Sequence, residues 1–484
     1  MTTIATSIVG GDAVTGGEES FDVNPSDTSD VVLATAHADA DVASQAVAAA
    51  RAAFPAWSTT TPWQRAEVLD RAGSEVLARA DELGDLLARE EGKTLPEARG
   101  EVVRAAQILK YFAGAVLQPH GQALDSVRPG IDVTVTREPV GVVSVITPWN
   151  FPIAIPAWKV APALAFGNTV VLKPAELVPA SAVELVAILN RAGLPAGALN
   201  LVLGRGSVVG DTLTTHPDVD AVTFTGSQAT GERILRAPGA KLNRKVQLEL
   251  GGKNPVIVLD DADLATAVEV VVQGGFGSTG QRCTASSIAV VADGIHDRFV
   301  EAVRERLGRW SVGDARAAGT DMGPVVDDGQ LQQNLGYLRT AASEGGEVVG
   351  GSLLELAASG HYMEPALVLG TSVGDTINRE EVFGPVVSVI RVADYDEALA
   401  AANASEMNLS AGIVTRDLAA ASHFKRHSKA GMVMVNLPTA GVDFHVPFGG
   451  RGLSSLGPRE QGYAAADFFT VSKTAYTAPG TTTL

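Results

Sequence analysis

Alternating strand and helix signals constrain the fold more than any other feature of this 484-residue sequence. From the apolar run Val142 to Ile146 onward, short β-branched stretches such as "NTVVLKP" and "DAVTFTG" are separated by segments with helical periodicity, for example Ser181 to Ala192. A second series of the same kind begins near Gly251 and includes "NPVIVL", "SIAVVADG" and "VSVIRV". Such alternation predicts parallel sheets with helices on both faces. We therefore expect an α/β protein with two doubly wound domains and a hinge at Gly251 and Gly252.

Three segments lie outside this alternation. Apolar residues recur every three or four positions from Asp39 to Ala115, which predicts a run of amphipathic helices. Val133 and Val135 alternate with threonines, which is typical of an exposed antiparallel strand. The last twenty residues also include a strand-like segment without a sheet of its own. We expect that segment to pair with the edge of another chain.

Charge and composition exclude several classes of protein. The net charge of −18 makes nucleic acid and anionic membranes poor partners. No apolar stretch approaches the roughly 20 residues of a membrane span, and the first residues lack the basic start of a secretory signal. The single cysteine cannot form an internal disulfide, which fits a cytoplasmic protein. The eight histidines show no metal-ligand spacing, so we expect no metal site.

The only cysteine, Cys283, lies in "GSTGQRCTASS" among small polar residues. A structural cysteine usually has apolar neighbours, whereas here a nearby charge and backbone N–H groups could stabilise a thiolate. This setting favours a nucleophile. The alternative is a small buried side chain at the start of a helix, because free cysteines are among the most buried residues.

Two further residues have surroundings that suit catalysis. Glu249 lies between two leucines at the end of a predicted strand, and burial there would raise its pKa toward the range of a general base. A solvent-facing strand end is the alternative. Asn150 lies between two prolines in "TPWNFP", a stiff turn that could hold its amide as a donor to a developing oxyanion. Turn capping is the commoner role of asparagine.

Three loops could contact a dinucleotide. "GRGSVVG", with Gly206, follows a predicted strand but is one residue too long for G-x-G-x-x-G. "FTGS" places Gly226 and Ser227 before a helix whose N-terminal amides could bind an anion, and Ser227 could also cap that helix. "LKPAE" offers Lys173 and Glu176 to ribose hydroxyls, or it is an exposed loop pair.

The order of these motifs is more specific than any one of them. "TPWNFP", "LKPAE", "FTGS", "LELGGKNP", "GQRCTA", "EVFGPV" and "PFGG" follow one another, and together they resemble the aldehyde dehydrogenase superfamily from about Val23 to Tyr476. The resemblance implies two doubly wound α/β domains plus a β oligomerisation arm. It assigns residues 1–122 and 141–250 to a cofactor-binding domain, 251–446 to a catalytic domain, 123–140 and 464–484 to the arm, and 447–463 to a return segment near the active site.

The resemblance also implies roles for individual residues. Cys283 would be the nucleophile, Glu249 the general base, and Asn150 the oxyanion donor together with the Cys283 backbone N–H. The cofactor would be NAD or NADP, with NAD slightly favoured because Glu176 would repel a 2′-phosphate, although Lys173 nearby could tolerate one. The protein would be a homodimer or homotetramer. The residues expected at the cofactor are Trp149, Lys173, Glu176, Gly206, Gly226, Ser227, Glu381 and Phe383.

A narrower resemblance concerns the substrate. "VNLPTAGVDFHVPFGG", "SSLGPREQG" and "GIHDRFVEA" resemble the α-ketoglutaric semialdehyde (2,5-dioxopentanoate) dehydrogenase group, although a lysine of that group's pattern is absent where Gly452 stands. A carboxylated substrate needs a cation, and Arg282 and Arg451 are candidates unless they form surface ion pairs. Succinate semialdehyde and other aliphatic or aromatic aldehydes remain alternatives, as does a catalytically silent nicotinamide-binding protein.

Overall fold

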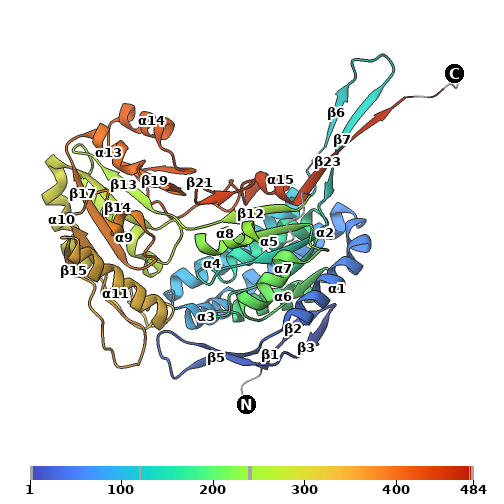
Figure 1. The fold of residues 1–484 in the computed structure, drawn as a ribbon, viewed down its shortest axis with the longest axis horizontal. Helices are drawn as coiled ribbons and strands as arrows, with labels where there is room; N and C mark the ends of the chain where they lie inside the picture. Colours follow the sequence, from blue (N-terminus) through green and yellow to red (C-terminus); the bar gives the residue numbers. More distant parts are fainter. Residues whose placement is uncertain (1–3, 119–120, 238–242, 479, 481–484) are drawn as a thin grey trace.

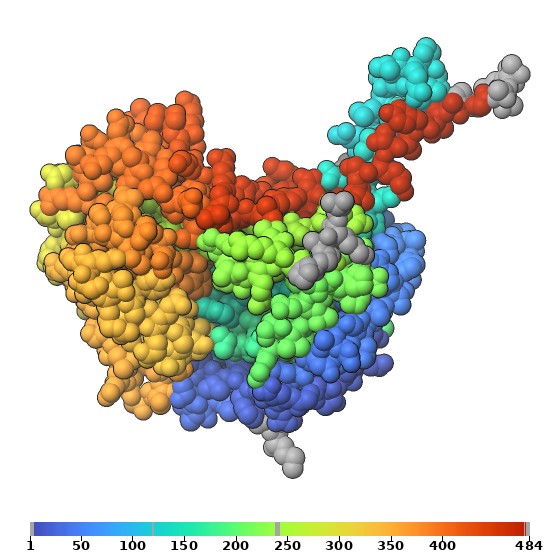
Figure 2. Space-filling view, viewed as in Figure 1, coloured from blue at the N-terminus to red at the C-terminus, as the bar shows by residue number. Residues whose placement is uncertain are grey.

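The computed structural model describes residues 4–118, 121–237, 243–478 and 480. Two α/β units lie side by side, and a thin β arm projects away from them (Figure 1). Figure 2 shows the same division in space-filling form, with the blue-to-green unit packed against the yellow-to-orange one. The expected α/β class, with two large sheets and a separate β arm, is confirmed.

The first unit contains an eight-stranded sheet of order β22-β12-β11-β8-β9-β10-β2-β3. Its five central strands are parallel. Strand β8 pairs with β9 on one side and with β11 on the other. Successive strands are therefore added outward in opposite directions from β8, and such a switch point leaves a crevice at the carboxyl ends of the strands. The strands are β8 (Val142–Ile146), β9 (Thr169–Lys173), β10 (Leu199–Leu201), β11 (Ala221–Thr225) and β12 (Lys245–Glu249), with antiparallel β2 (Ser7–Val9), β3 (Asp12–Val14) and β22 (Ser455–Leu456) at the edges.

Helices surround this sheet, and the predicted helical run before β8 is confirmed. The start of α2 is fixed by a capping box, because the Thr61 hydroxyl accepts from the Gln64 N–H while the Gln64 side chain accepts from the Thr61 N–H. Helix α5 is buried along its whole length, which anchors the chain that follows Asn150. The helices are α1 (Ala40–Ser58), α2 (Pro62–Ala78), α3 (Ala80–Glu91), α4 (Leu95–Ala115), α5 (Ala154–Ala165), α6 (Ala180–Arg191), η1 (Gly206–Gly210), α7 (Asp211–Thr215) and α8 (Gln228–Arg236).

The second unit contains a seven-stranded sheet of order β15-β16-β17-β14-β13-β19-β20, parallel except for β15. Val256 packs with α9 and α10 on one face, while the next residue, Ile257, packs with α13 and α14 on the other. Both faces are therefore covered, as a doubly wound sheet requires. The strands are β13 (Asn254–Val258), β14 (Ser286–Ala292), β15 (Glu347–Gly350), β16 (Ala366–Leu369), β17 (Val386–Val392), β19 (Ser410–Val414) and β20 (Met432–Val435); the helices are α9 (Leu264–Phe276), α10 (Asp293–Leu307), α11 (Asp328–Ser343), α12 (Thr376–Arg379), α13 (Tyr395–Ala402) and α14 (Leu418–His427).

The arm corrects one expectation about the end of the chain. Strand β23 (Thr470–Thr477) follows α15 (Ala465–Phe469) and pairs antiparallel with β7 (Asp132–Pro139) of the same chain, and β7 also pairs with β6 (Gln122–Asp125). The expectation that this segment has no sheet of its own is wrong, because a distant part of the sequence supplies one. Residues 479 and 481–484, the end of the expected arm, lie outside the described residues.

Smaller strands complete the fold. An N-terminal sheet that the sequence patterns did not indicate consists of β1 (Ile4–Ala5), β4 (Glu19–Val23) and β5 (Val31–Ala36). Strand β18 (Met407–Asn408) pairs with β21 (Arg451–Gly452). Along the described parts of the chain, no helix combines the length and apolar character needed to cross a lipid bilayer.

Candidate active site

Cys283 lies in a strained loop between α9 and β14. The short helix η2 (Gly277–Gly280) precedes it, and inside η2 both Ser278 (φ 49°) and Thr279 (φ 56°) have left-handed backbone conformations that non-glycine residues rarely adopt. The Ser278 N–H donates to a Glu97 carboxylate oxygen at 2.8 Å, so a helix of the first unit holds this loop. The alternative that Cys283 stands at the start of a helix is wrong, because a β-strand follows it.

Two cavities meet at Cys283, which is partly exposed. One has a volume of about 270 Å³ and lies on the side of the β8 and β11 carboxyl ends. The other has a volume of about 230 Å³ and lies on the side of α4. A sulfur at such a junction can face one ligand in each cavity. We refer to them as the β8–β11 cavity and the α4 cavity.

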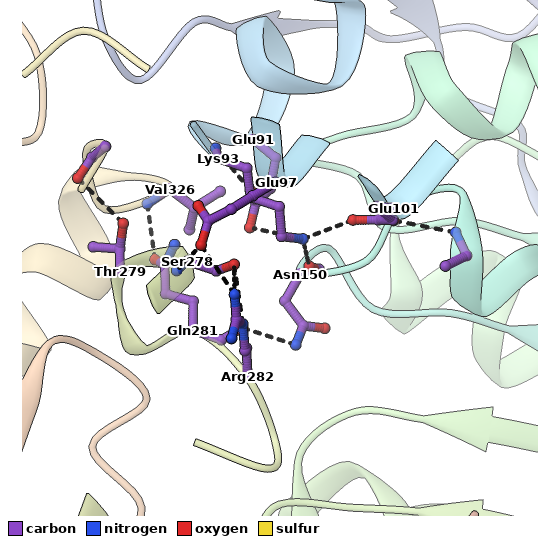
Figure 3. A network of polar contacts seen from close by, with 12 residues as sticks. Glu91, Lys93, Glu97, Glu101, Asn150, Ser278, Thr279, Gln281, Arg282 and Val326 are labelled. Atoms are coloured by element: carbon purple, nitrogen blue, oxygen red, sulfur yellow. Dashed lines mark hydrogen bonds and ion pairs between the residues drawn. The ribbon is translucent and has the colours of Figure 1, made fainter. Parts of the chain in front are cut away.

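Asn150 follows β8 and lines the β8–β11 cavity together with Cys283. Its side-chain Nδ2 donates to the Gln281 carbonyl at 2.9 Å, which fixes the amide beside the Cys283 loop (Figure 3). An amide nitrogen carries two N–H groups, so one remains for a ligand. The structure therefore brings the predicted donor and the predicted nucleophile to one cavity.

A buried charge network holds the backbone of Asn150 (Figure 3). The Lys93 ammonium donates to the Asn150 carbonyl and to a Glu101 carboxylate oxygen at 2.8 Å. The other Glu101 oxygen accepts from the Ile153 and Ala154 N–H groups at the start of α5. These contacts satisfy the buried charges of Lys93 and Glu101 and fix the turn that carries Asn150.

The surroundings of Cys283 favour the neutral thiol over the thiolate. Burial, followed by the negative charges of Glu381, Glu249 and Glu460, raises its pKa to about 12. The expected stabilisation of a thiolate by a neighbouring charge is not found, because the Arg282 guanidinium is engaged with Glu97 at 3.0 Å and with the Ser278 hydroxyl at 2.7 Å. Activation therefore requires a change in these surroundings or a proton acceptor.

Glu249 ends β12 and is only 2% exposed. One of its oxygens accepts from the Ser455 hydroxyl at 2.6 Å, and the other is buried without a hydrogen-bond partner among the described residues. Burial, and then the charge of Glu460, raise its pKa well above the usual range, as the sequence predicts for a buried position. Glu249 lines neither cavity in this conformation, so its carboxylate would have to turn to reach a group on Cys283.

Five of the residues expected at the cofactor line the β8–β11 cavity: Trp149, Gly226, Ser227, Glu381 and Phe383. The Trp149 and Phe383 rings form an edge-to-face pair with centroids 5.3 Å apart, although Phe383 has a left-handed φ of 59°. Glu381 accepts from the Gly252 N–H at 2.8 Å, and burial raises its pKa to about 7. This cavity therefore has an aromatic wall and a carboxylate that can receive a hydroxyl donor.

The other three expected residues form a second cluster outside the lining of that cavity. Lys173 ends β9, and its ammonium lies 3.7 Å from a Glu176 carboxylate oxygen, which also accepts from the Gly206 N–H. Burial lowers the pKa of Lys173. Because β9 and β10 are neighbouring parallel strands, this cluster lies at the same carboxyl edge of the sheet as Asn150 and Gly226.

The β8–β11 cavity and this cluster fit a nicotinamide dinucleotide. The Thr225 hydroxyl lines the cavity and is buried without a hydrogen-bond partner in the described chain. Helix α8 starts there, and its N-cap Ser227 accepts from the Thr230 N–H, which leaves the first amides of the helix for an anionic phosphate. Hydroxyl acceptors, an anion site and an aromatic wall are the groups that such a cofactor requires.

Neither arginine proposed from the sequence is free beside Cys283. Arg282 lines the α4 cavity but is bonded to Glu97 and Ser278. Arg451 is exposed on β21 and lines neither of the two cavities at Cys283. Sequence reasoning missed Arg104, which lines the α4 cavity. Its spacing from Glu97 and Glu101 places all three on one face of a helix, a signal that the sequence does contain.

Comparisons with known proteins agree with this geometry. A family model described as "Aldehyde dehydrogenase family" matches residues 14–475. The chain is 44% identical to alpha-ketoglutarate semialdehyde dehydrogenase of Haloferax volcanii, covering 98% of this chain and 99% of that protein. It is also 44% identical to alpha-ketoglutaric semialdehyde dehydrogenase of Bacillus subtilis, covering 94% of each. Betaine aldehyde dehydrogenase from Staphylococcus aureus, solved in complex with NAD+, superimposes with a TM-score of 0.95 at 32% identity, covering 99% of this chain and 95% of that one.

Proposed function

This chain belongs to the aldehyde dehydrogenase family and oxidises aldehydes with NAD(P), and on this premise we propose that its substrate is α-ketoglutaric semialdehyde. The observation that carries the proposal is the position of Cys283 at the junction of two cavities, which we assign to the cofactor and to the aldehyde. The names of the 44% identical relatives support this substrate over other aldehydes. Succinate semialdehyde is the nearest alternative, because it also carries an aldehyde and a carboxylate.

The reaction begins with attack of the Cys283 sulfur on the aldehyde carbon. The thiol proton passes to water, a new C–S bond forms, and the electron pair of the carbonyl π bond moves to its oxygen, which becomes an oxyanion. The free N–H of the Asn150 amide and the Cys283 backbone N–H stabilise that oxyanion. The Gln281 carbonyl and the Lys93 network keep Asn150 in position, so no reorganisation is needed as charge develops.

The tetrahedral adduct then collapses by expelling its hydride. A bound oxidised nicotinamide would supply the hydride acceptor, and the acyl group would remain on Cys283 as a thioester. Trp149, Ser227 and Phe383 line the β8–β11 cavity and would hold the cofactor there, and Glu381 would accept from its nicotinamide ribose. Lys173, Glu176 and Gly206 would lie at the adenosine ribose, where Glu176 would favour NAD over NADP because a carboxylate repels a 2′-phosphate.

Hydrolysis regenerates the thiol. Glu249 turns from Ser455 toward Cys283 and takes a proton from water, which attacks the thioester and releases the carboxylate product. Gly449 leaves the room for this carboxylate, since a Cβ at that position would lie 2.8 Å from a Glu249 oxygen. The raised pKa of Glu249 makes its carboxylate a stronger proton acceptor once it is ionised, and the proton that it takes from water passes to the departing Cys283 sulfur.

The same proposal covers domain roles and assembly. Residues 1–122 and 141–250 bind the cofactor, 251–446 carry the nucleophile, and 447–463 return to the site, where Ser455 meets Glu249. The arm, residues 123–140 and 464–484, joins chains into a homodimer or homotetramer through the exposed edge of its sheet. We place the enzyme in the cytoplasm, where its single thiol stays reduced.

A substrate panel tests the proposal. Purified protein is mixed with NAD or NADP and with α-ketoglutaric semialdehyde, succinate semialdehyde, glutaraldehyde, betaine aldehyde or benzaldehyde, and the absorbance of reduced cofactor is followed. We expect the highest kcat/KM with α-ketoglutaric semialdehyde and NAD. A higher value for betaine aldehyde or benzaldehyde would contradict the substrate, and no turnover with any aldehyde would contradict the catalytic assignment.

A further inference from the structure

Arg104 lies on α4 and lines the α4 cavity together with Cys283. Its guanidinium is mostly removed from solvent, yet the described residues give it no ion pair and only one hydrogen bond, a 3.4 Å contact with the Gln461 side chain. Its Nε is buried without a partner. A guanidinium carries five N–H donors, so most of the bonding capacity of Arg104 is unused.

The carboxylates on the same helix do not supply the missing partner. Glu101 is paired with Lys93 and also accepts from two backbone N–H groups. Glu97 is paired with Arg282. The lining of the α4 cavity thus contains three cations and two carboxylates, and Arg104 is the cation left over. Asp443, the other acidic group that affects Arg104, is exposed and forms no ion pair with it in the described chain.

The walls beside Arg104 are aromatic. Phe151, Trp158 and Phe448 line the same cavity, and the Arg104 guanidinium carbon lies 6.0 Å from the centre of the Trp158 ring. The Trp158 indole N–H is also buried without a partner among the described residues. Low polarity around a charged group strengthens its attraction for an opposite charge. A small anion in this cavity would therefore meet one strong and uncompensated cation.

We infer that Arg104 binds the carboxylate of the substrate and thereby selects aldehydes that carry a carboxylate at the far end. The inference rests on the proposed function, since it assumes that the aldehyde group reaches Cys283 through the α4 cavity. The planar guanidinium suits a carboxylate, which it can bind through two parallel N–H bonds. Arg104 takes the role that the sequence suggested for Arg282 or Arg451: the first is already paired, and the second lies outside the cavity.

The test compares charged and neutral aldehydes on matched variants. Initial rates with NAD are measured for α-ketoglutaric semialdehyde, succinate semialdehyde and the neutral aldehyde pentanal. Arg104→Met removes the charge, and Arg104→Lys keeps the charge but not the two parallel N–H donors of the guanidinium. Arg451→Met tests whether Arg451 binds the carboxylate instead. Arg298→Met replaces an exposed arginine on α10 and serves as the neutral control.

We expect Arg104→Met to lower kcat/KM for the two carboxylated aldehydes by about 30- to 100-fold, the range for loss of a charge-assisted pair. Pentanal should change by no more than about threefold, because it has no carboxylate to lose. Arg104→Lys should lie between wild type and Arg104→Met for the carboxylated substrates. Pentanal turnover also reports that each variant is folded.

Three results would overturn the inference: equal losses on charged and neutral aldehydes, no loss in either Arg104 variant, or a selective loss in Arg451→Met alone. Failure of the proposed function is recognised separately, because it appears in the wild type as the absence of any preference for carboxylated aldehydes over pentanal. A wild-type preference that persists in Arg104→Met contradicts only the role of Arg104.

Discussion

The ammonium of Lys93 and the carboxylate of Glu101 form a 2.8 Å ion pair in which both side chains are almost completely buried, at 2% and 1% exposed. Lys93 joins this pair to the Asn150 carbonyl, and Glu101 joins it to the start of α5. The pair therefore connects a helix of the first unit to the turn that carries the oxyanion donor. Removing the two charges from water costs free energy, and their mutual attraction offsets this cost only while both partners are present.

Replacement of Lys93 by methionine should leave the Glu101 charge buried and unpaired. We expect a loss of stability of about 3 to 5 kcal/mol, measured by denaturant or thermal unfolding. Lys93→Met combined with Glu101→Leu should be less destabilised than the sum of the single variants, because the second change removes the stranded charge. If Asn150 is positioned through this network, kcat with a neutral aldehyde should fall in Lys93→Met while KM for NAD stays constant. Additive stabilities in the double variant would argue against the pair.

Cys283→Ala tests the nucleophile. Without the sulfur no covalent adduct can form, so we expect oxidation of every aldehyde to fall below detection. The β8–β11 cavity keeps its other lining residues, so the affinity for NAD should stay within about threefold of wild type, as measured by calorimetry or fluorescence titration. Turnover comparable to wild type would remove Cys283 from the mechanism.

Glu249→Gln separates the two halves of the reaction. Hydride transfer does not need the Glu249 base, whereas hydrolysis of the thioester does. We expect a burst of reduced cofactor of about one equivalent per active site, followed by a steady-state rate lowered by about 100-fold or more. Stopped-flow absorbance measures both phases. Loss of the burst itself would show that Glu249 acts before hydride transfer.

Ser455→Ala probes the pKa of the same carboxylate. The Ser455 hydroxyl donates to Glu249 and stabilises its charged form, so removing it should raise the Glu249 pKa further. A general base works only when deprotonated, and kcat falls as the pH drops through its pKa. The acid limb of the kcat–pH profile should therefore move to higher pH in Ser455→Ala. A shift to lower pH would contradict the assignment of that limb to Glu249.

Most of the fold could be predicted from the sequence because its strands are short runs of β-branched residues between amphipathic helices. The buried strand β8 and the helices before it follow this rule. The pairing of β23 with β7 could not be predicted from local sequence patterns, because such patterns do not tell a strand whether it will join an edge of its own chain or of another chain. Only the family resemblance places residues 123–140 and 464–484 in one arm.

The site was harder to predict than the fold wherever burial depends on tertiary packing. Lys93, Glu101 and Arg104 belong to residue types that are usually exposed. The packing of α4 against the start of α5 and the Cys283 loop buries Lys93 and Glu101 and leaves Arg104 only partly exposed. The hydrogen bond between Glu249 and Ser455 joins positions 206 residues apart, so no local sequence pattern indicates it. The thiol pKa likewise depends on three carboxylates from distant parts of the chain.

The carboxylates of Glu381, Glu249 and Glu460 also determine how fast the Cys283 thiol of the free enzyme reacts with an alkylating reagent. Iodoacetamide alkylates the thiolate, and with a Cys283 pKa of about 12 the reaction should be slow at pH 7 and accelerate steadily toward pH 10.

Glu381 has a pKa of about 7, so it is charged at pH 9 and disfavours the thiolate there, but it is largely neutral at pH 6. Glu381→Gln should therefore speed alkylation at pH 9 by several-fold and change it little at pH 6. Glu380→Gln, which alters the exposed neighbouring carboxylate, is the matched control and should behave like wild type at both values. Slower alkylation of Glu381→Gln at pH 9 would mean that Glu381 assists removal of the thiol proton. It would contradict the repulsion between the Glu381 carboxylate and the Cys283 thiolate.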